Sequence, residues 1–164
     1  MNNERIIFKI KTNIKYKFFW GSYFSNWYIL DFEVDEITYN CGEQYMMYQK
    51  ALAFNDIETA NMIIMEVDPS KQKKLGRQVK NFNQKFWDKV KYDLVKKGLR
   101  EKFTQHEHLK KYLLQYKNFQ IVEASPYDRI WGIGYDSKNA LKNIDNWGEN
   151  LLGKILTELA QEIK

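Results

Sequence analysis

Apolar residues recur every three or four positions along much of the chain, which predicts a mainly helical fold. The clearest example is segment 84–103, where an apolar stripe faces a lysine-rich side. That stripe consists of Phe86, Trp87, Val90, Leu94, Val95, Leu99 and Phe103. By the same periodicity and the helix-ending residues between them, we expect further helices within 41–54, 57–67, 109–116 and 151–163.

Strand patterns are short and lie mostly near the N-terminus. In segment 29–34, apolar side chains alternate with acidic ones, which is the period of a half-buried strand. The pair at 35–36 then turns the chain into 37–39, so these two segments predict a hairpin. Segments 4–10 and 119–122 have strand-like composition as well.

Length and composition indicate one domain that is rich in aromatic rings. A chain of 164 residues can bury one substantial core, and we expect a single compact domain over residues 1–164. The expected fold class is α+β, predominantly helical, with a small N-terminal β element. Aromatic residues make up 16% of the chain, and such rings can build a core or form walls around a planar ligand.

The charge balance narrows the class of partner. Basic residues number 26 and acidic residues 21, which leaves a net charge of +5. This excess suits a phosphate-bearing partner and does not require nucleic acid. A solvated basic face is the commoner explanation.

The remaining composition points to a cytoplasmic protein without a metal or another cofactor. Cys41 is the single cysteine, so an intrachain disulfide is excluded, and together with His106 and His108 it makes no plausible zinc-ligand set. Residues 1–17 carry charges throughout, and no run approaches the length of a membrane span. We therefore expect no membrane partner.

The helix within 41–54 carries two charges although nearly all of its surface is apolar. Glu43 and Lys50 are seven residues apart, which places them on nearly the same side of the helix and about 10 Å apart along its axis. That separation is too long for a direct ion pair and suits contacts with two parts of one ligand. The alternative is an ordinary core helix with a surface-facing Glu43 and a Lys50 that extends its amine to water.

Two loops rich in aromatic residues are further candidates for a binding site. Segment 18–28 holds seven aromatics in eleven positions and fits neither a helix nor a strand, so it either presents rings to a ligand or covers the core. Segment 123–134 follows a strand candidate, and in it Asp128 precedes Trp131 by three residues, which can put a carboxylate beside an aromatic wall. The alternative is a rigid turn in which Asp128 caps its own backbone.

Phosphate binding has two candidate positions. The basic run 71–80 follows Asp68 and Ser70, either of which can cap its helix, and it can present Arg77 to a phosphate. Such a run is more often a solvated face. Residues 147–150 open the last helix, whose N-terminal amides suit an anion.

Six motifs occur in order along the chain. They are Phe24-Ser25-Asn26; Glu43-x-x-Met-Met-x-Gln49-Lys50-Ala51; Asp68-Pro69 followed by Gly76-Arg77; Trp87 followed by Lys102-Phe103; Glu123-Ala124-Ser125-Pro126-x-Asp128-x-x-Trp131-Gly132-x-Gly134; and Gly148-x-Asn150-x-Leu152-Gly153. In these motifs the chain resembles the NADAR domain family, also called the YbiA-like family. The resemblance covers about residues 16–163.

The resemblance implies a YbiA-like fold and an enzyme that hydrolyses N-glycosidic bonds between ribose and a base. YbiA-like members act on ribosylamino-pyrimidine 5-phosphate intermediates of riboflavin biosynthesis, and the Met46-Met47 form of the central helix favours this small-molecule substrate. Other members remove ADP-ribose from guanine in nucleic acid, which makes ADP-ribosylated nucleic acid the alternative partner. A third possibility, from another class, is a non-catalytic module that binds ADP-ribose or nucleic acid. The oligomeric state is not predicted.

The resemblance also implies roles for particular residues. Glu43, Lys50 and Asp128 are the catalytic candidates, with Lys50 forming a Schiff base to C1 of the sugar and the two carboxylates moving protons, in an order that stays open. The expected substrate-binding residues are Trp20, Asn26, Arg77, Trp87, Ser125, Trp131, Gly132 and Asn150. Trp87 or Trp131 would stack on the base, and Arg77 with the amides near Asn150 would bind the phosphate.

Overall fold

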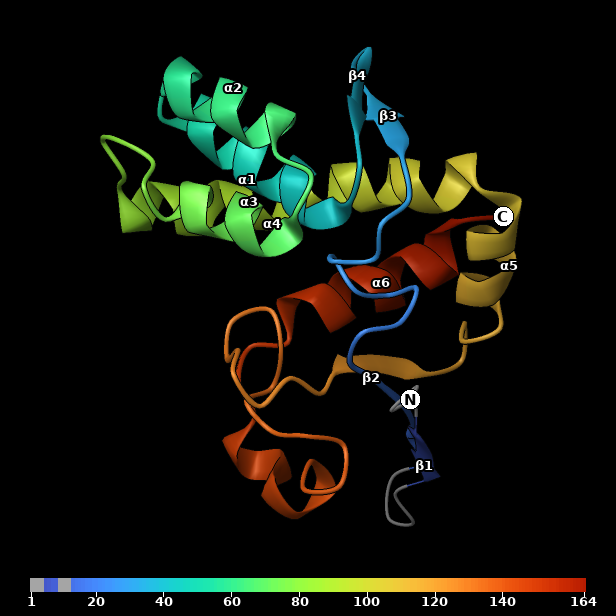
Figure 1. The fold of residues 1–164 in the computed structure, drawn as a ribbon. Coiled ribbons are helices and arrows are strands. Elements are labelled where there is room, and N and C mark those ends of the chain that lie inside the picture. The colour runs from blue at the N-terminus through green and yellow to red at the C-terminus, as the bar shows by residue number, and fades with distance from the viewer. Residues whose placement is uncertain (1–4, 9–12) are drawn as a thin grey trace. The chain divides into compact units, whose positions relative to one another are not determined.

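The computed structural model describes residues 5–8 and 13–164, and the chain divides into two compact units. The inserted unit comprises Asn26–Gln105, and the terminal unit comprises Met1–Ser25 together with His106–Lys164. Helices dominate both units, and each has a small sheet (Figure 1). The predicted class, a predominantly helical α+β fold, is confirmed. Among the described helices, none is long and apolar enough to cross a bilayer.

The inserted unit consists of one hairpin and four helices. In chain order they are β3 (Phe32–Val34), β4 (Ile37–Tyr39), α1 (Gly42–Ala53), α2 (Ile57–Met65), α3 (Pro69–Gly76) and α4 (Gln84–Gln105). Helix α1 packs against α2, α3 and α4 (Figure 1). The predicted hairpin is confirmed, although its first strand begins at Phe32 and not at residue 29. Asp35 and Glu36 both adopt a positive φ, the turn geometry that matches the twist of a two-residue hairpin.

Side-chain caps determine where three of these helices begin. Sγ of Cys41 accepts a hydrogen bond from the amide of Gln44 at the start of α1. Asp56 accepts from the amide of Thr59 at the start of α2. Of the two predicted caps for α3, the structure uses Asp68. This residue directly precedes the helix, and its side chain accepts from the amides of Ser70 and Lys71 in the first turn. The capping residues are one cysteine and two aspartates.

The core around α1 is built from rings that pack against small residues. Tyr45 contacts Phe32, Val34 and Tyr39 of the hairpin, and its hydroxyl donates to the carbonyl of Leu94 at 3.0 Å. On α4, Gly98 allows this approach, because a Cβ there would lie 2.2 Å from the Tyr45 ring. The close contact fixes α1, and with it the side chains that α1 presents.

The terminal unit contains a three-stranded sheet and three helical segments. They are β1 (Arg5–Phe8), β2 (Lys15–Phe19), β5 (Gln120–Glu123), α5 (Glu107–Leu114), the 3₁₀ segment η1 (Leu141–Asn146) and α6 (Leu151–Glu162). The strand order is β1-β2-β5, with β1 antiparallel and β5 parallel to β2. Strand β1 confirms the predicted strand at 4–10, whose residues 4, 9 and 10 lie outside the described range.

Strand β2 corrects the sequence analysis, which assigned Phe18 and Phe19 to an irregular loop. Tyr16, Lys17, Phe18 and Phe19 are all buried. A strand covered on both faces shows no alternation of polar and apolar residues, so the period-two search did not detect it.

Side chains of α6 bond to the outer edge of β5. Oδ1 of Asn150 accepts from the Glu123 amide at 2.9 Å, and its Nδ2 donates to the Ile121 carbonyl at 3.1 Å. The Ile121 amide donates to Oγ1 of Thr157 at 2.9 Å. Gly153 lets α6 approach closely, since a Cβ there would lie 2.3 Å from the Ile121 carbonyl oxygen. The polar groups of this edge are thereby satisfied within the unit.

Candidate active site

Lys50 is a half-buried amine in the last turn of α1. Its Nζ donates to the carbonyl of Gly76, at the end of α3, at 2.8 Å, and lies 4.3 Å from the centroid of the Phe82 ring. Burial lowers the pKa of Lys50, and the nearby Arg77 guanidinium lowers it further. The Glu43 carboxylate opposes both effects. Lys50 is thus an amine with a reduced cost of losing its proton.

Glu43 lies in the first turn of α1 and is only 3% exposed. Its Oε2 accepts a hydrogen bond of 3.2 Å from the indole Nε1 of Trp27. Because Trp27 itself is 45% exposed, its ring connects a buried carboxylate to the surface of the unit. A buried carboxylate is costly unless polar groups hold it, so this indole is part of what makes Glu43 tolerable.

Asn26 lies beside the N-terminus of α1. Its carbonyl accepts from the Glu43 amide at 2.8 Å, and its side chain is buried. Among the described residues, none donates to its Oδ1. A Cβ on Gly42 would come within 2.6 Å of that oxygen, so glycine is needed for the fit. A buried amide oxygen without a protein donor is costly, which is typical of a group that serves a ligand or a water molecule.

Two basic side chains of the α3 segment lie near Trp27 and Lys50. Lys73 places its Nζ 5.9 Å from the Trp27 ring, and Arg77, the C-cap residue of α3, is exposed close enough to Lys50 to lower its pKa. The four-residue spacing of Lys73 and Arg77 puts both on one face of the segment. Gly76 between them packs against Met47, whose Sδ would lie 2.0 Å from a Cβ at that position. Arg77 thus lies near Lys50 within the inserted unit, and its predicted role in binding a phosphate stays a prediction.

Trp87, predicted to stack on a base, is buried on α4. The exposed rings beside the α1 charges are instead Trp27 and Phe82, neither of which the sequence analysis selected. Trp27 directly follows the Phe24-Ser25-Asn26 motif, so its position was a usable signal. Phe82 had no comparable signal, because only the loop geometry brings it to Lys50.

A second lysine with a lowered pKa lies in the same unit. Lys102 is fully buried, and burial lowers its pKa to about 8, while the neighbouring Cys41 thiol partly offsets this effect. Burial raises the pKa of Cys41 to about 11. The Nζ of Lys102 donates to the Tyr28 carbonyl at 3.2 Å. Since Lys102 has no exposed surface, Lys50 is the better placed of the two amines for meeting a substrate.

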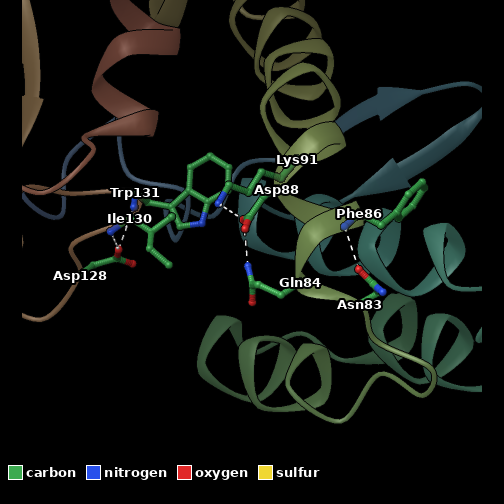
Figure 2. A network of polar contacts seen from close by, with 8 residues as sticks. All are labelled: Asn83, Gln84, Phe86, Asp88, Lys91, Asp128, Ile130 and Trp131. Carbon is green, nitrogen blue, oxygen red and sulfur yellow. Dashed lines mark hydrogen bonds and ion pairs between the residues drawn. The ribbon is translucent and has the colours of Figure 1, made fainter.

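Lys91, which is also buried in the inserted unit, is paired. The Nζ of Lys91 lies 2.5 Å from Oδ1 of Asp88, which also accepts from Nε2 of Gln84 at 2.9 Å (Figure 2). These contacts run along one face of α4. They engage Lys91 in a surface-connected ion pair, so it is a weaker candidate for chemistry than Lys50.

In the terminal unit, the loop after β5 is folded onto itself. Oδ1 of Asp128 accepts from the amides of Ile130 and Trp131, both at 2.8 Å (Figure 2). Oγ of Ser125 accepts from the Tyr127 amide at 3.4 Å. A Cβ on Gly132 would lie 2.9 Å from the Glu123 carbonyl oxygen. The alternative considered for Asp128, a turn that caps its own backbone, is thus realised for Oδ1, while Oδ2 lies outside these two bonds.

The first amides of α6 are engaged by this same loop. The amides of Asn150, Leu151 and Leu152 donate to the carbonyls of Gly132, Ile130 and Trp131 at 3.0–3.2 Å. The side-chain amide of Asn150 is engaged with β5, as described above. A phosphate has no direct access to these amides in this arrangement, so Asn150 has a structural position here.

The predicted site residues fall in both units. Asn26, Glu43, Lys50, Arg77 and Trp87 belong to the inserted unit; Trp20, Ser125, Asp128, Trp131, Gly132 and Asn150 belong to the terminal unit. The structure brings Asn26, Glu43, Lys50 and Arg77 together around α1 and α3. That both sets serve one site stays a prediction. Within the described residues, no group of three or more His, Cys, Asp or Glu is arranged to hold a metal ion.

Comparison with known proteins establishes the class. Residues 18–164 match the NADAR domain family, and the chain belongs to this family. It is 42% identical over 163 residues to N-glycosidase R617 of Acanthamoeba polyphaga mimivirus, and this alignment covers 90% of this chain and 96% of R617. It is 31% identical over 140 residues to N-glycosidase YbiA of Escherichia coli strain K12, covering 85% and 80% of the two chains. The fold is also similar to the NMR structure of E. coli YbiA, with a TM-score of 0.75 and 29% sequence identity. The superposition covers 90% of this chain and 84% of the YbiA chain. The resemblance predicted from the six motifs is therefore confirmed.

Proposed function

We propose that this NADAR chain is an N-glycosidase that hydrolyses the bond between ribose and a base, with Lys50 as its nucleophile. The observation that carries the proposal is the half-buried amine of Lys50, with its lowered pKa, on the same helix as the buried carboxylate of Glu43. A nucleophilic lysine must be unprotonated, and burial favours that form. The names of the curated relatives support the enzyme class, a hydrolase acting on N-glycosyl bonds.

The reaction proceeds in two stages that share one covalent intermediate. First, the lone pair of Nζ forms a bond to C1 of the ribose while the C1–N bond to the base breaks, and the departing base takes a proton. The ring oxygen then leaves C1 and accepts a proton, so that a C=N bond joins C1 to Lys50. Water next adds to C1, the bond to Nζ breaks as Nζ regains its proton, and the released sugar, ribose 5-phosphate for a 5-phosphate substrate, leaves with the lysine amine restored.

Carboxylates supply the proton transfers. Glu43 is the candidate in the inserted unit, where the indole of Trp27 fixes its Oε2. Asp128 is the candidate from the terminal unit, through the oxygen that does not cap the loop. A carboxyl group near the departing nitrogen donates a proton, and a carboxylate near the incoming water accepts one. Which of the two fills each role is left to the variants Glu43→Gln and Asp128→Asn.

The proposed substrate is a ribosylamino-pyrimidine 5-phosphate, an early intermediate of riboflavin biosynthesis. Arg77 and Lys73 offer the positive charge for one phosphate, and their four-residue spacing suits a single phosphoryl group. The exposed indole of Trp27 offers a flat surface for a pyrimidine ring. Trp131 remains the candidate ring from the terminal unit.

Borohydride trapping tests the nucleophile directly. Reduction of the C=N bond fixes the sugar to Lys50, so intact-protein mass spectrometry of the wild type incubated with substrate should show the added mass, and peptide mapping should place it on residue 50. Lys50→Ala should lose the adduct and about a hundredfold or more of the base release. Lys89→Ala, which removes an exposed lysine of α4, is the matched control and should keep both. A fully active Lys50→Ala variant without adduct would assign the chemistry to the carboxylates.

A second candidate substrate, ADP-ribosylated guanine in nucleic acid, is favoured by the basic face of α3. Lys71, Lys74 and Arg77 are exposed there. A panel of ribosyl-pyrimidine phosphates and ADP-ribosylated DNA, with released base and ADP-ribose detected by mass spectrometry, separates the two. Affinity for DNA should fall steeply with salt, whereas a single phosphate gives a shallower dependence. Binding without any released product would favour a non-catalytic module.

A further inference from the structure

The loop between α3 and α4 places an aromatic ring over the amine of Lys50. Phe82 belongs to this loop, residues 77–83, and its ring centroid lies 4.3 Å from Nζ. The same amine donates to the Gly76 carbonyl at 2.8 Å. An ammonium within about 6 Å of a ring face is attracted by the negative potential of that face. The amine thus has two contacts, one with a carbonyl and one with a ring.

Hydrogen bonds tie the loop down along its length. The Gln78 amide donates to the Leu75 carbonyl at 2.8 Å, and the Lys80 amide donates to Oδ2 of Asp56 at 2.8 Å. Asp56 caps α2 with its other oxygen, so one carboxylate joins the loop to the turn after α1. At the far end, Oδ1 of Asn83 accepts from the Phe86 amide at 3.0 Å (Figure 2). A loop held in this way presents Phe82 in a defined place.

Packing also fixes the ring. Phe82 meets Phe54, the C-cap residue of α1, edge to face at 5.2 Å between centroids. Phe86 also packs against Phe54, with 5.6 Å between the two ring centroids. Phe82 and Phe86 are similarly exposed, at 40% and 45%. They differ in that Phe82 lies over Lys50.

We propose that Phe82 is a positioning residue for Lys50, whose ring holds the amine against the Gly76 carbonyl and sets how readily it gives up its proton. The role of this amine in catalysis rests on the proposed function, but its place and its titration do not. The backbone bonds that anchor the loop are independent of the side chain at position 82, so the loop can keep its place when the ring is replaced.

The direction of the effect follows from the charges around Nζ. Arg77 at the end of α3 and burial both disfavour the ammonium, and Glu43 on α1 favours it. The Phe82 ring face also favours the ammonium. Replacing the ring by an aliphatic side chain of similar volume keeps the site covered but removes that attraction. The pKa of Lys50 should therefore fall further in Phe82→Leu.

The test is a titration of Lys50 followed by NMR of the full chain labelled with ¹³C at lysine Cε, with the Lys50 signal assigned by its absence in Lys50→Gln. In Phe82→Leu the midpoint should fall by about half a pH unit, the size expected of an exposed cation–π contact. Phe86→Leu, which loses a comparable contact with Phe54, should titrate as the wild type does. The acidic limb of kcat/KM should move with the NMR midpoint.

The outcomes separate the two proposals. An unchanged or raised midpoint in Phe82→Leu, or an equal fall in Phe86→Leu, would overturn the role of Phe82. A lowered midpoint in Phe82→Leu combined with full activity of Lys50→Ala would keep Phe82 as the residue that positions the amine while the proposed lysine chemistry fails. Because the NMR readout needs no substrate, it is informative whichever ribosyl compound the enzyme uses.

Discussion

The indole Nε1 of Trp27 lies 3.2 Å from Oε2 of Glu43, so a ring that is half exposed donates to a carboxylate that is almost wholly buried. The backbone reinforces this relationship, because the residue before Trp27 accepts a hydrogen bond from the Glu43 amide. The loop and the first turn of α1 are therefore joined by both a side-chain and a backbone hydrogen bond. A change at the Trp27 ring should therefore be felt at the Glu43 carboxylate.

Removing that donor should impair turnover more than binding. Trp27→Phe keeps a flat ring and loses the N–H, and a hydrogen bond to a charged group is worth about 1.5–3 kcal/mol, so kcat should fall roughly 10- to 100-fold. Trp27→His, which can donate from a ring nitrogen, should recover part of the loss. Steady-state kinetics across pH would check this. A change confined to KM in Trp27→Phe would make Trp27 a binding surface only.

Lys102 should give stability an unusual dependence on pH. Its pKa is about 8 in the folded chain against an ordinary 10.5, so between these values the unfolded state binds more protons and the free energy of unfolding rises with pH. The rise between pH 8 and 9 should be about 1 kcal/mol, and Lys102→Met should flatten it. Urea unfolding at several pH values measures both.

Cys41 opposes Lys102 at higher pH. Its pKa is raised from 9.0 to about 11, so between these values the folded state binds more protons and stability falls as pH rises. Cys41→Ala should remove that fall and extend the rise due to Lys102 toward pH 10.5. A decline of equal steepness above pH 9 in Cys41→Ala would show that other groups dominate there.

The contact of Gly98 with Tyr45 should make an alanine at position 98 destabilising. In an exposed helix the change from glycine to alanine is favourable by about 1 kcal/mol. Here the new Cβ would lie 2.2 Å from a ring anchored through its hydroxyl, and overpacking costs about 1–3 kcal/mol, so a net loss is expected. Denaturant unfolding of Gly98→Ala, Tyr45→Leu and the double variant would show the strain relieved in the double variant.

Asn150 should act on stability and not on substrate affinity. Asn150→Ala leaves the Glu123 amide and the Ile121 carbonyl without their partners, which should cost about 2–4 kcal/mol of unfolding free energy. Asn150→Asp retains the acceptor and should lose less. A raised KM with unchanged denaturation midpoint in Asn150→Ala would restore the binding role that the sequence motif suggested.

Periodicity was sufficient for the hairpin and for helices such as α4 and α6, because those elements each have a solvated face; α1 has no exposed residue and was found from its length and its apolar composition. Strand β2 escaped detection because Lys17 and Phe19 are as buried as Tyr16 and Phe18 on the opposite face. The family motifs located Glu43 and Lys50, and spacing alone placed them on one side of α1. Spacing could not show that Asp128 caps its own loop, since a carboxylate at that position serves a turn or a substrate equally well.

The residues that the sequence analysis missed depend on contacts between distant segments. Phe82 reaches Lys50 from another loop, and Trp27 reaches Glu43 across sixteen positions. Lys102 has an altered pKa only because packing removes it from water. None of these follows from local pattern, because burial and the meeting of loops are properties of the tertiary structure.

The side chains along β5 also limit how copies of this chain can associate. Backbone amides and carbonyls on the outer edge of an edge strand normally invite a strand from another molecule. Here Asn150 and Thr157 occupy the Ile121 and Glu123 amides and the Ile121 carbonyl, and the Ile133 amide donates to the Glu123 carbonyl at 3.0 Å. Intermolecular strand addition at β5 would first have to detach α6, so this edge is protected against sheet extension and the aggregation that follows from it.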